Sequence, residues 1–87
     1  MNIIDRYVDY IRTVRRYSDR TVAIYESVLY DFADAVGVTD DDEGLIDSFK
    51  VSQIRSYQVS LIDERKMAPK TVALHMSVLS SFCRYLI

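Results

Sequence analysis

The chain has 87 residues, 49% of them hydrophobic and 28% charged, with a formal net charge of −2, which is typical of a globular protein with one hydrophobic core. One cysteine and one histidine exclude a disulfide framework and a zinc site, and no apolar run approaches the ~20 residues that span a bilayer. The first residues also lack the basic-then-apolar order of a signal peptide, so the sequence predicts a cytoplasmic domain with no metal, no cofactor and no membrane partner.

Sparse glycine and proline predict long helices, because glycine occurs only twice and proline only at Pro69. The first helix is predicted over residues 2–15, where apolar side chains recur at the three-and-four spacing of one helix face. These side chains are Ile4, Tyr7, Val8, Ile11 and Val14. The second helix is predicted over residues 19–36, with Ser18 as its N-cap and Gly37 free to take the positive φ of a C-terminal cap.

The second half of the chain is predicted to hold two more helices. The third covers residues 50–64, and its inward face is formed by Val51, Ile54, Tyr57, Gln58 and Leu61. Pro69 fits the first turn of a fourth helix over residues 69–86, where its missing N–H group leaves no helical hydrogen bond unmade. Residues 38–48 are acidic in their first half and are predicted to form a surface loop. The sequence therefore predicts a single all-α domain.

The acidic residues are concentrated in Asp40–Glu43. The glycine and the distant glutamate of an EF-hand calcium loop are not at the required spacings, so we expect this run to be a solvated loop. Without these four residues the formal charge changes from −2 to +2. The basic residues then form two clusters before or at the start of predicted helices, namely Arg12, Arg15, Arg16 and Arg20, and Arg65, Lys66 and Lys70.

An internal repeat relates residues 17–36 to residues 67–86. Seven positions are identical: Thr21 and Thr71, Val22 and Val72, Ala23 and Ala73, Ser27 and Ser77, Val28 and Val78, Leu29 and Leu79, and Phe32 and Phe82. Arg20 and Lys70 also match in charge. A threonine preceded by a base at the start of a helix combines a hydroxyl, a cation and unpaired amides at the positive end of the helix dipole, which suits phosphate oxygens. Two such ends on one face of the molecule are expected to hold a duplex backbone.

These motifs resemble a known family in their order and spacing. The stretch IDRYVDYI is followed by a helix of the form Y-S-x-x-T-[VI]-x-x-Y-x-x-x-L-x-x-F, then by I-R-x-Y-x-x-x-L, and finally by K-T-[VI]-x-x-x-x-S-x-L-x-x-F-x-x-Y-L. The matching residues are Tyr17, Ser18, Thr21, Val22, Tyr25, Leu29 and Phe32, then Ile54, Arg55, Tyr57 and Leu61, then Lys70, Thr71, Val72, Ser77, Leu79, Phe82, Tyr85 and Leu86. The chain thus resembles the N-terminal core-binding (SAM-like) domain of tyrosine recombinases of the phage-integrase type, including Xer-like and mobile-element integrases of bacteria.

The resemblance implies an orthogonal bundle of four helices, or of five with a short extra turn, that forms half of a C-shaped clamp on double-stranded DNA. Helices 19–36 and 69–86 are expected to face the duplex, and the acidic run to point away from it. The resemblance also implies a bacterial cytoplasmic protein that meets other protomers of the same recombinase on DNA, with the isolated domain monomeric. The catalytic half is expected to follow residue 87, so this chain is expected to have no catalytic residue and no enzyme activity, and Tyr85 a structural role.

The candidate DNA-binding residues share a place near the starts of the two repeated helices or on their exposed polar positions. They are Arg15, Arg16, Ser18, Arg20, Thr21, Lys66, Lys70, Thr71, Ser77 and Ser80. Members of the family often carry a base where Ser80 stands, so the contact there is expected to be a neutral hydrogen bond. The alternatives are that the bases are ordinary solvated charges and that the threonines only cap helices.

Other residues have structural interpretations. His75 is expected to pack or to lie on the surface, and Cys83 to be a small buried hydrophobe. A second function of a different class also fits the sequence, namely a helical protein-interaction module that docks a partner on an exposed apolar face of the first or the last helix, without direct DNA contact.

Overall fold

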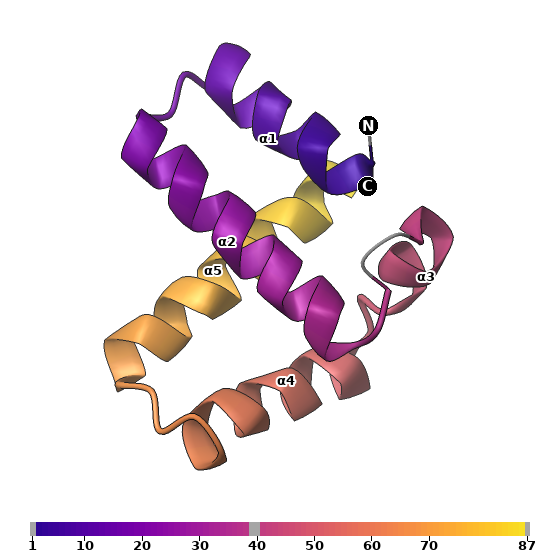
Figure 1. The fold of residues 1–87 in the computed structure, drawn as a ribbon, viewed down its shortest axis with the longest axis vertical. Helices are drawn as coiled ribbons and strands as arrows, with labels where there is room; N and C mark the ends of the chain where they lie inside the picture. Colours follow the sequence, from indigo (N-terminus) through magenta and orange to yellow (C-terminus); the bar gives the residue numbers. More distant parts are fainter. Residues whose placement is uncertain (1, 39–40, 87) are drawn as a thin grey trace.

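The computed structural model describes residues 2–38 and 41–86, and these ranges contain helices and no strand, which confirms the all-α prediction. The elements are α1 (Ile3–Thr13), α2 (Asp19–Ala35), α3 (Asp42–Asp47), α4 (Val51–Asp63) and α5 (Pro69–Leu86). Helices α1 and α2 form one hairpin, α4 and α5 form another, and α5 crosses behind α2 where the two hairpins meet (Figure 1). Within the described ranges, no helix has the length and hydropathy needed to cross a membrane.

The predicted loop over residues 38–48 contains α3, which is the short fifth element. The Asp41 side chain accepts a hydrogen bond from the Gly44 amide at 3.0 Å, and Asp42 and Glu43 lie in the first turn. Acidic side chains at this end of a helix are stabilised by its dipole, so the acidic run starts a helix. Asp40 lies outside the described residues.

Two apolar residues that were predicted to face the core are exposed. Val14 follows the last residue of α1, which ends two residues earlier than predicted, and its side chain is 65% exposed. Val51 is the first residue of α4 and is 71% exposed. The periodicity of these helices is correct, but neither terminal position lies over a neighbouring helix.

The internal repeat is longer in the structure than in the sequence, because it includes α1 and α4. The turns between the helices of each hairpin have the same geometry. Arg16 and Lys66 have φ values of 55° and 54°. The Tyr17 amide donates to the Ile11 carbonyl at 2.9 Å, and the Met67 amide donates to the Leu61 carbonyl at 3.0 Å. The equivalent pairs then continue back along the first helices, to Tyr7 and Tyr57 and to Ile4 and Ile54. The fold is therefore two copies of one helical hairpin.

Aromatic side chains interlock the two hairpins. The ring of Phe32 from α2 packs edge-on against Tyr57 of α4, with centroids 5.1 Å apart. The equivalent Phe82 from α5 packs against Tyr7 of α1 at 5.0 Å. Phe49 lies between the two phenylalanines, 5.0 Å from Phe32 and 5.3 Å from Phe82. Each hairpin thus completes the core of the other.

A polar cluster also joins the hairpins. The Tyr57 hydroxyl donates to Asp31 Oδ2 at 2.5 Å, and Arg65 Nη1 donates to the same oxygen at 2.7 Å. Nδ1 of His75 lies 3.1 Å from the Tyr57 hydroxyl. Burial opposes the ionisation of Asp31, but the bonds from Tyr57 and Arg65 prevail and lower its pKa below the ordinary value. Ionised Asp31 therefore stabilises the folded state.

We expect Asp31→Asn to lower the free energy of unfolding by about 1–2 kcal/mol at pH 7, because it weakens two hydrogen bonds to a charged group. A carboxylate with a depressed folded-state pKa stabilises the fold above its unfolded pKa of ~3.9, and this contribution is lost as the pH falls through the folded-state value. Urea denaturation should therefore show the difference between the two proteins narrowing below about pH 4. The exposed Asp34 on the same helix provides the control, since Asp34→Asn should change stability by less than ~0.5 kcal/mol. Equal effects of the two substitutions would contradict the assignment.

Candidate nucleic-acid interface

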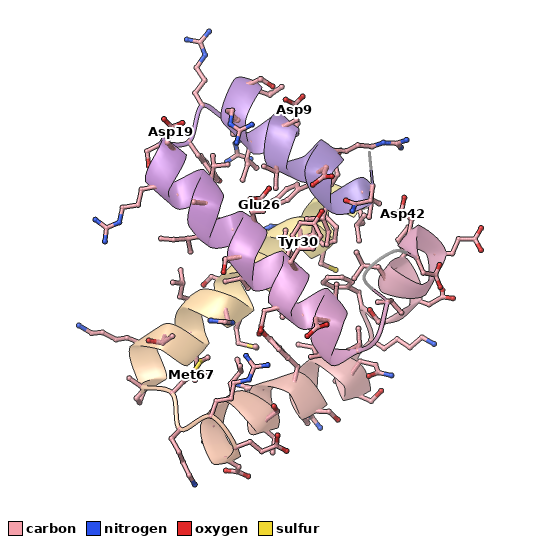
Figure 2. All side chains as sticks on the ribbon, viewed as in Figure 1. Asp9, Asp19, Glu26, Tyr30, Asp42 and Met67 are labelled. Atoms are coloured by element: carbon pink, nitrogen blue, oxygen red, sulfur yellow. The ribbon has the colours of Figure 1, made fainter. Side chains whose placement is uncertain are left out.

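The two repeated helices begin on the same side of the molecule. Figure 2 labels Asp19 at the start of α2 and Met67 just before α5, both on the left of the view, and Asp42 of α3 on the right. A groove of about 360 Å³ lies between the first halves of α2 and α5, with Arg20 on one side and Leu74 and His75 on the other. The predicted helix ends thus face a common side, and the acidic α3 lies on the opposite side.

The hydroxyl groups at the start of α2 already form hydrogen bonds within this helix end. The Ser18 hydroxyl accepts from the Thr21 amide at 3.2 Å and donates to the Thr21 hydroxyl at 2.9 Å. Ser18 is the N-cap, as predicted, and Asp19 places a carboxylate in the first turn. Ser18 and Thr21 are therefore occupied in capping, and Asp19 repels an approaching phosphate.

The start of α5 is more open to an anion. Ala68 stands where α2 has Ser18, and it contributes only its carbonyl, which accepts from the amides of Thr71 and Val72 at 3.0 Å. Among the described residues, the Lys70 amide and the Thr71 hydroxyl have no hydrogen-bond partner, and the first turn of α5 contains no acid. The chemistry predicted for both helix ends is therefore present mainly at α5.

The two equivalent helices carry opposite charge. Helix α2 contains four acids and one arginine, a net charge of −3, whereas α5 contains one lysine, one arginine and no acid, a net charge of +2 with histidine neutral. The four acids of α2 and their counterparts on α5 are Asp19 and Pro69, Glu26 and Met76, Asp31 and Ser81, and Asp34 and Arg84. The repeat has kept its buried residues and changed the charge of its surface.

The structure places nine of the ten predicted site residues on the surface, and Thr21 is half-buried. Lys70, Ser77 and Ser80 lie on the exposed side of α5, and Lys66 lies in the turn that leads into this helix. Arg16 occupies the equivalent turn before α2, and Arg15, Ser18 and Arg20 lie next to this turn or at the start of α2. Thr71 lies in the first turn of α5. The set therefore divides into a group at α5 and a group at the start of α2.

Arg84 belongs to the same exposed face of α5 and was missed in the sequence analysis. It follows Lys70 and Ser77 at intervals of seven residues, which brings side chains back to nearly the same face of a helix. This spacing was the signal that could have identified it.

Three residues outside the predicted DNA-binding set were expected to have structural roles. His75 is half-buried beside Tyr57, and burial lowers its pKa, so it packs in the neutral form at neutral pH. The ring of Tyr85 lies 4.9 Å from that of Tyr7, which agrees with the structural role expected. Cys83 is half-buried, so the prediction that it is buried is wrong. The described residues contain no cluster of three side chains able to hold a metal ion.

Comparison with known proteins identifies the family. A search of curated proteins found no match, and neither did a search of solved structures. Residues 3–87 match the family model of the phage integrase N-terminal SAM-like domain, which includes every described helix. The resemblance noted in the motifs is thereby confirmed, and the chain belongs to the family of phage integrase N-terminal SAM-like domains.

Proposed function

We propose that the chain binds double-stranded DNA as the N-terminal module of a site-specific tyrosine recombinase, mainly through phosphate contacts made by α5 and the turn before it. The observation that carries this proposal is the division of charge between the two equivalent helices. The cationic face of α5 consists of Lys66, Lys70, Ser77, Ser80 and Arg84, all exposed and with no acid among them. Membership of the integrase family supports the same partner.

The net charge of −2 does not oppose this function, because a duplex meets only one face of the protein. The acids lie mainly on α2 and α3, and α3 is on the side opposite the starts of α2 and α5 (Figure 2). Lysines that neutralise backbone phosphates release counterions, so the affinity of such an interface falls steeply with salt. The exposed serines of α5 can donate hydrogen bonds to phosphate oxygens or base edges.

In this proposal the catalytic step belongs to another domain of the parent recombinase, in the bacterial cytoplasm. The α5 face supplies affinity and register on the core site, with few base contacts. Arg20 in the first turn of α2 and Arg16 in the turn before it make weaker contacts, because the carboxylate of Asp19 lies in the same first turn and the cap uses the nearby hydroxyls.

A second candidate function is contact between protein partners, and it is supported by apolar side chains exposed on α4. Val51, Val59 and Ile62 of this helix are exposed, whereas the described part of α1 contains no exposed large hydrophobic residue. A groove of about 330 Å³ lies between α4 and α5, with Ile62 and Pro69 among its lining residues. We propose that this side contacts a neighbouring protomer on DNA.

We expect the pair of substitutions Lys66→Gln and Lys70→Gln to weaken binding of a short labelled duplex, most strongly at low salt. The slope of log binding constant against log salt should become shallower by roughly 2, because each neutralised phosphate contributes about 0.9. Fluorescence anisotropy over roughly 50–200 mM salt measures this slope. Lys50→Gln removes an exposed lysine at the start of α4 and should leave the slope unchanged. If the Lys50 variant changes the slope as much as the pair does, the α5 face is not the contact.

Ser80→Arg should strengthen DNA binding by adding a cation to the α5 face. The salt slope should steepen by about 0.9, and the gain in affinity should be largest at low salt. The comparison is Ser52→Arg, which adds the same charge at an exposed position of α4. An equal gain from both substitutions would show that net charge alone is responsible.

Ile62→Glu tests the second candidate, because a charge in the α4–α5 groove should disfavour an apolar contact. We expect lower cooperativity on a duplex with two adjacent sites and unchanged affinity for a single site. Asp63→Arg, an exposed neighbour, is the charge-changing control. Unchanged cooperativity in the Ile62 variant would exclude the groove as a protomer contact.

A further inference from the structure

A pocket of about 230 Å³ lies between α1, the turn that precedes α2 and the second half of α5. Its walls include three tyrosines, two arginines and a serine, namely Tyr7, Tyr10, Tyr85, Arg15, Arg84 and Ser81. The Tyr85 ring packs 4.9 Å from the ring of Tyr7 and 5.1 Å from that of Tyr10, which holds the aromatic wall in place. None of the described residues that line the pocket is acidic. The pocket therefore presents two guanidinium groups without an internal counter-charge.

The contact between α2 and α4 shows what the equivalent position can hold. By the repeat, Tyr7 corresponds to Tyr57, Arg15 to Arg65 and Ser81 to Asp31. There the Asp31 carboxylate of the first hairpin accepts from both Tyr57 and Arg65 of the second hairpin. At the pocket the Ser81 hydroxyl of the second hairpin replaces the carboxylate, so Tyr7 and Arg15 of the first hairpin lack this acceptor.

Arg84 increases the difference between the two positions. Its counterpart on α2 is Asp34, so the pocket has gained a cation where the other hairpin has an acid. Nη2 of Arg84 donates to Ser81 Oγ at 3.4 Å. The guanidinium therefore lies beside the position that a carboxylate at residue 81 would occupy. The charge of the site therefore suits an anion with more than one negative charge.

The Tyr7 hydroxyl is a buried donor that opens onto this pocket. Tyr7 is only 3% exposed, and its hydroxyl makes no hydrogen bond within the described part of the chain. Among the described residues, every side-chain polar atom that is fully buried has a hydrogen-bond partner. The Tyr7 hydroxyl has no partner among them, so it is not fully buried and reaches the pocket space. Burial, followed by the neighbouring hydroxyls of Tyr25 and Tyr17, raises the pKa of Tyr7 to about 12, so it remains a proton donor at neutral pH.

We propose that this pocket binds a phosphate group, with Arg15 and Arg84 pairing with its charged oxygens and the hydroxyls of Tyr7 and Ser81 donating to it. Two guanidinium groups without a carboxylate favour phosphate, since planar guanidinium donors bind its oxygens well and carry the matching charge. The Arg15 guanidinium lies 5.6 Å from the centre of the Tyr17 ring, which orients it at the edge of the pocket. The phosphate comes from a DNA backbone or from the free ion. Arg84 also belongs to the cationic face of α5, but the proposal does not depend on the contacts assigned to Lys66, Lys70 and Ser80.

The probe is inorganic phosphate, titrated into the 87-residue chain against chloride at constant ionic strength and followed by calorimetry and by NMR shifts of the arginine side chains. We expect saturable binding with a Kd on the order of 1 mM. Ser81→Asp places a carboxylate at the α5 position equivalent to Asp31 of α2, so it should raise the thermal midpoint without phosphate and weaken phosphate binding by about tenfold or more. Ser52→Asp makes the same change of charge at an exposed position of α4 that does not line the pocket, and it should retain most of the binding.

A second pair of variants keeps the test independent of how Ser81→Asp folds. Arg84→Gln should weaken phosphate binding by about tenfold, since it removes a charged hydrogen-bond donor, while Arg55→Gln on the exposed side of α4 should not. Lower duplex affinity in Ser81→Asp than in Ser52→Asp identifies the DNA backbone as the source of the phosphate, and equal affinity identifies the free ion. The proposal is overturned if the unmodified chain shows no saturable phosphate binding, or if Ser81→Asp and Arg84→Gln bind phosphate as it does. Loss of duplex binding in the Lys66 and Lys70 variants alone concerns the α5 contact and leaves the pocket unaffected.

Discussion

The crossing of α2 over α5 is the constraint on which the rest of this structure depends. Each hairpin has one apolar side, and a single hairpin cannot bury that side by itself. Phe32 closes on Tyr57 of the other hairpin, Phe82 closes on Tyr7, and Phe49 fills the space between the two phenylalanines. Because both contacts are made at once, the relative orientation of the hairpins is set, and with it the common side on which α2 and α5 begin.

Within this framework the two hairpins have diverged where divergence is compatible with the core. The buried residues Val28, Leu29 and Phe32 are identical to their counterparts, since a change of even one methylene is felt in a close-packed interior. The exposed residues are free of that constraint, and four acids of α2 correspond to non-acidic residues of α5. The result is one anionic and one cationic helix from the same pattern, which is why a chain with a negative net charge can present a basic face.

The same divergence produces two different polar sites from one arrangement of donors. Where Asp31 is present, it accepts a hydrogen bond from Tyr57 and balances the charge of Arg65, so the cluster strengthens the contact between hairpins. Where Ser81 takes the equivalent place, no carboxylate lies among the residues that line the pocket. A single difference between the repeats therefore leaves the donors Tyr7 and Arg15 without the acceptor that Asp31 provides in the other copy.

The sequence by itself determined the helices, the cap at Ser18, the turn at Gly37 and the family, because all of these depend on residues close together in the chain. It also located the repeat in the helices α2 and α5, where identities are dense. The opposite charges of α2 and α5 and the helix that Asp41 caps also follow from nearby residues, although they were not predicted. Only the tertiary structure showed that the turns after α1 and α4 share one geometry. It alone brought Arg65 to Asp31, and Arg15 to Arg84, from distant parts of the chain. The physical reason is that such pairs meet only where the hairpins cross, and no local spacing of residues encodes the angle of that crossing.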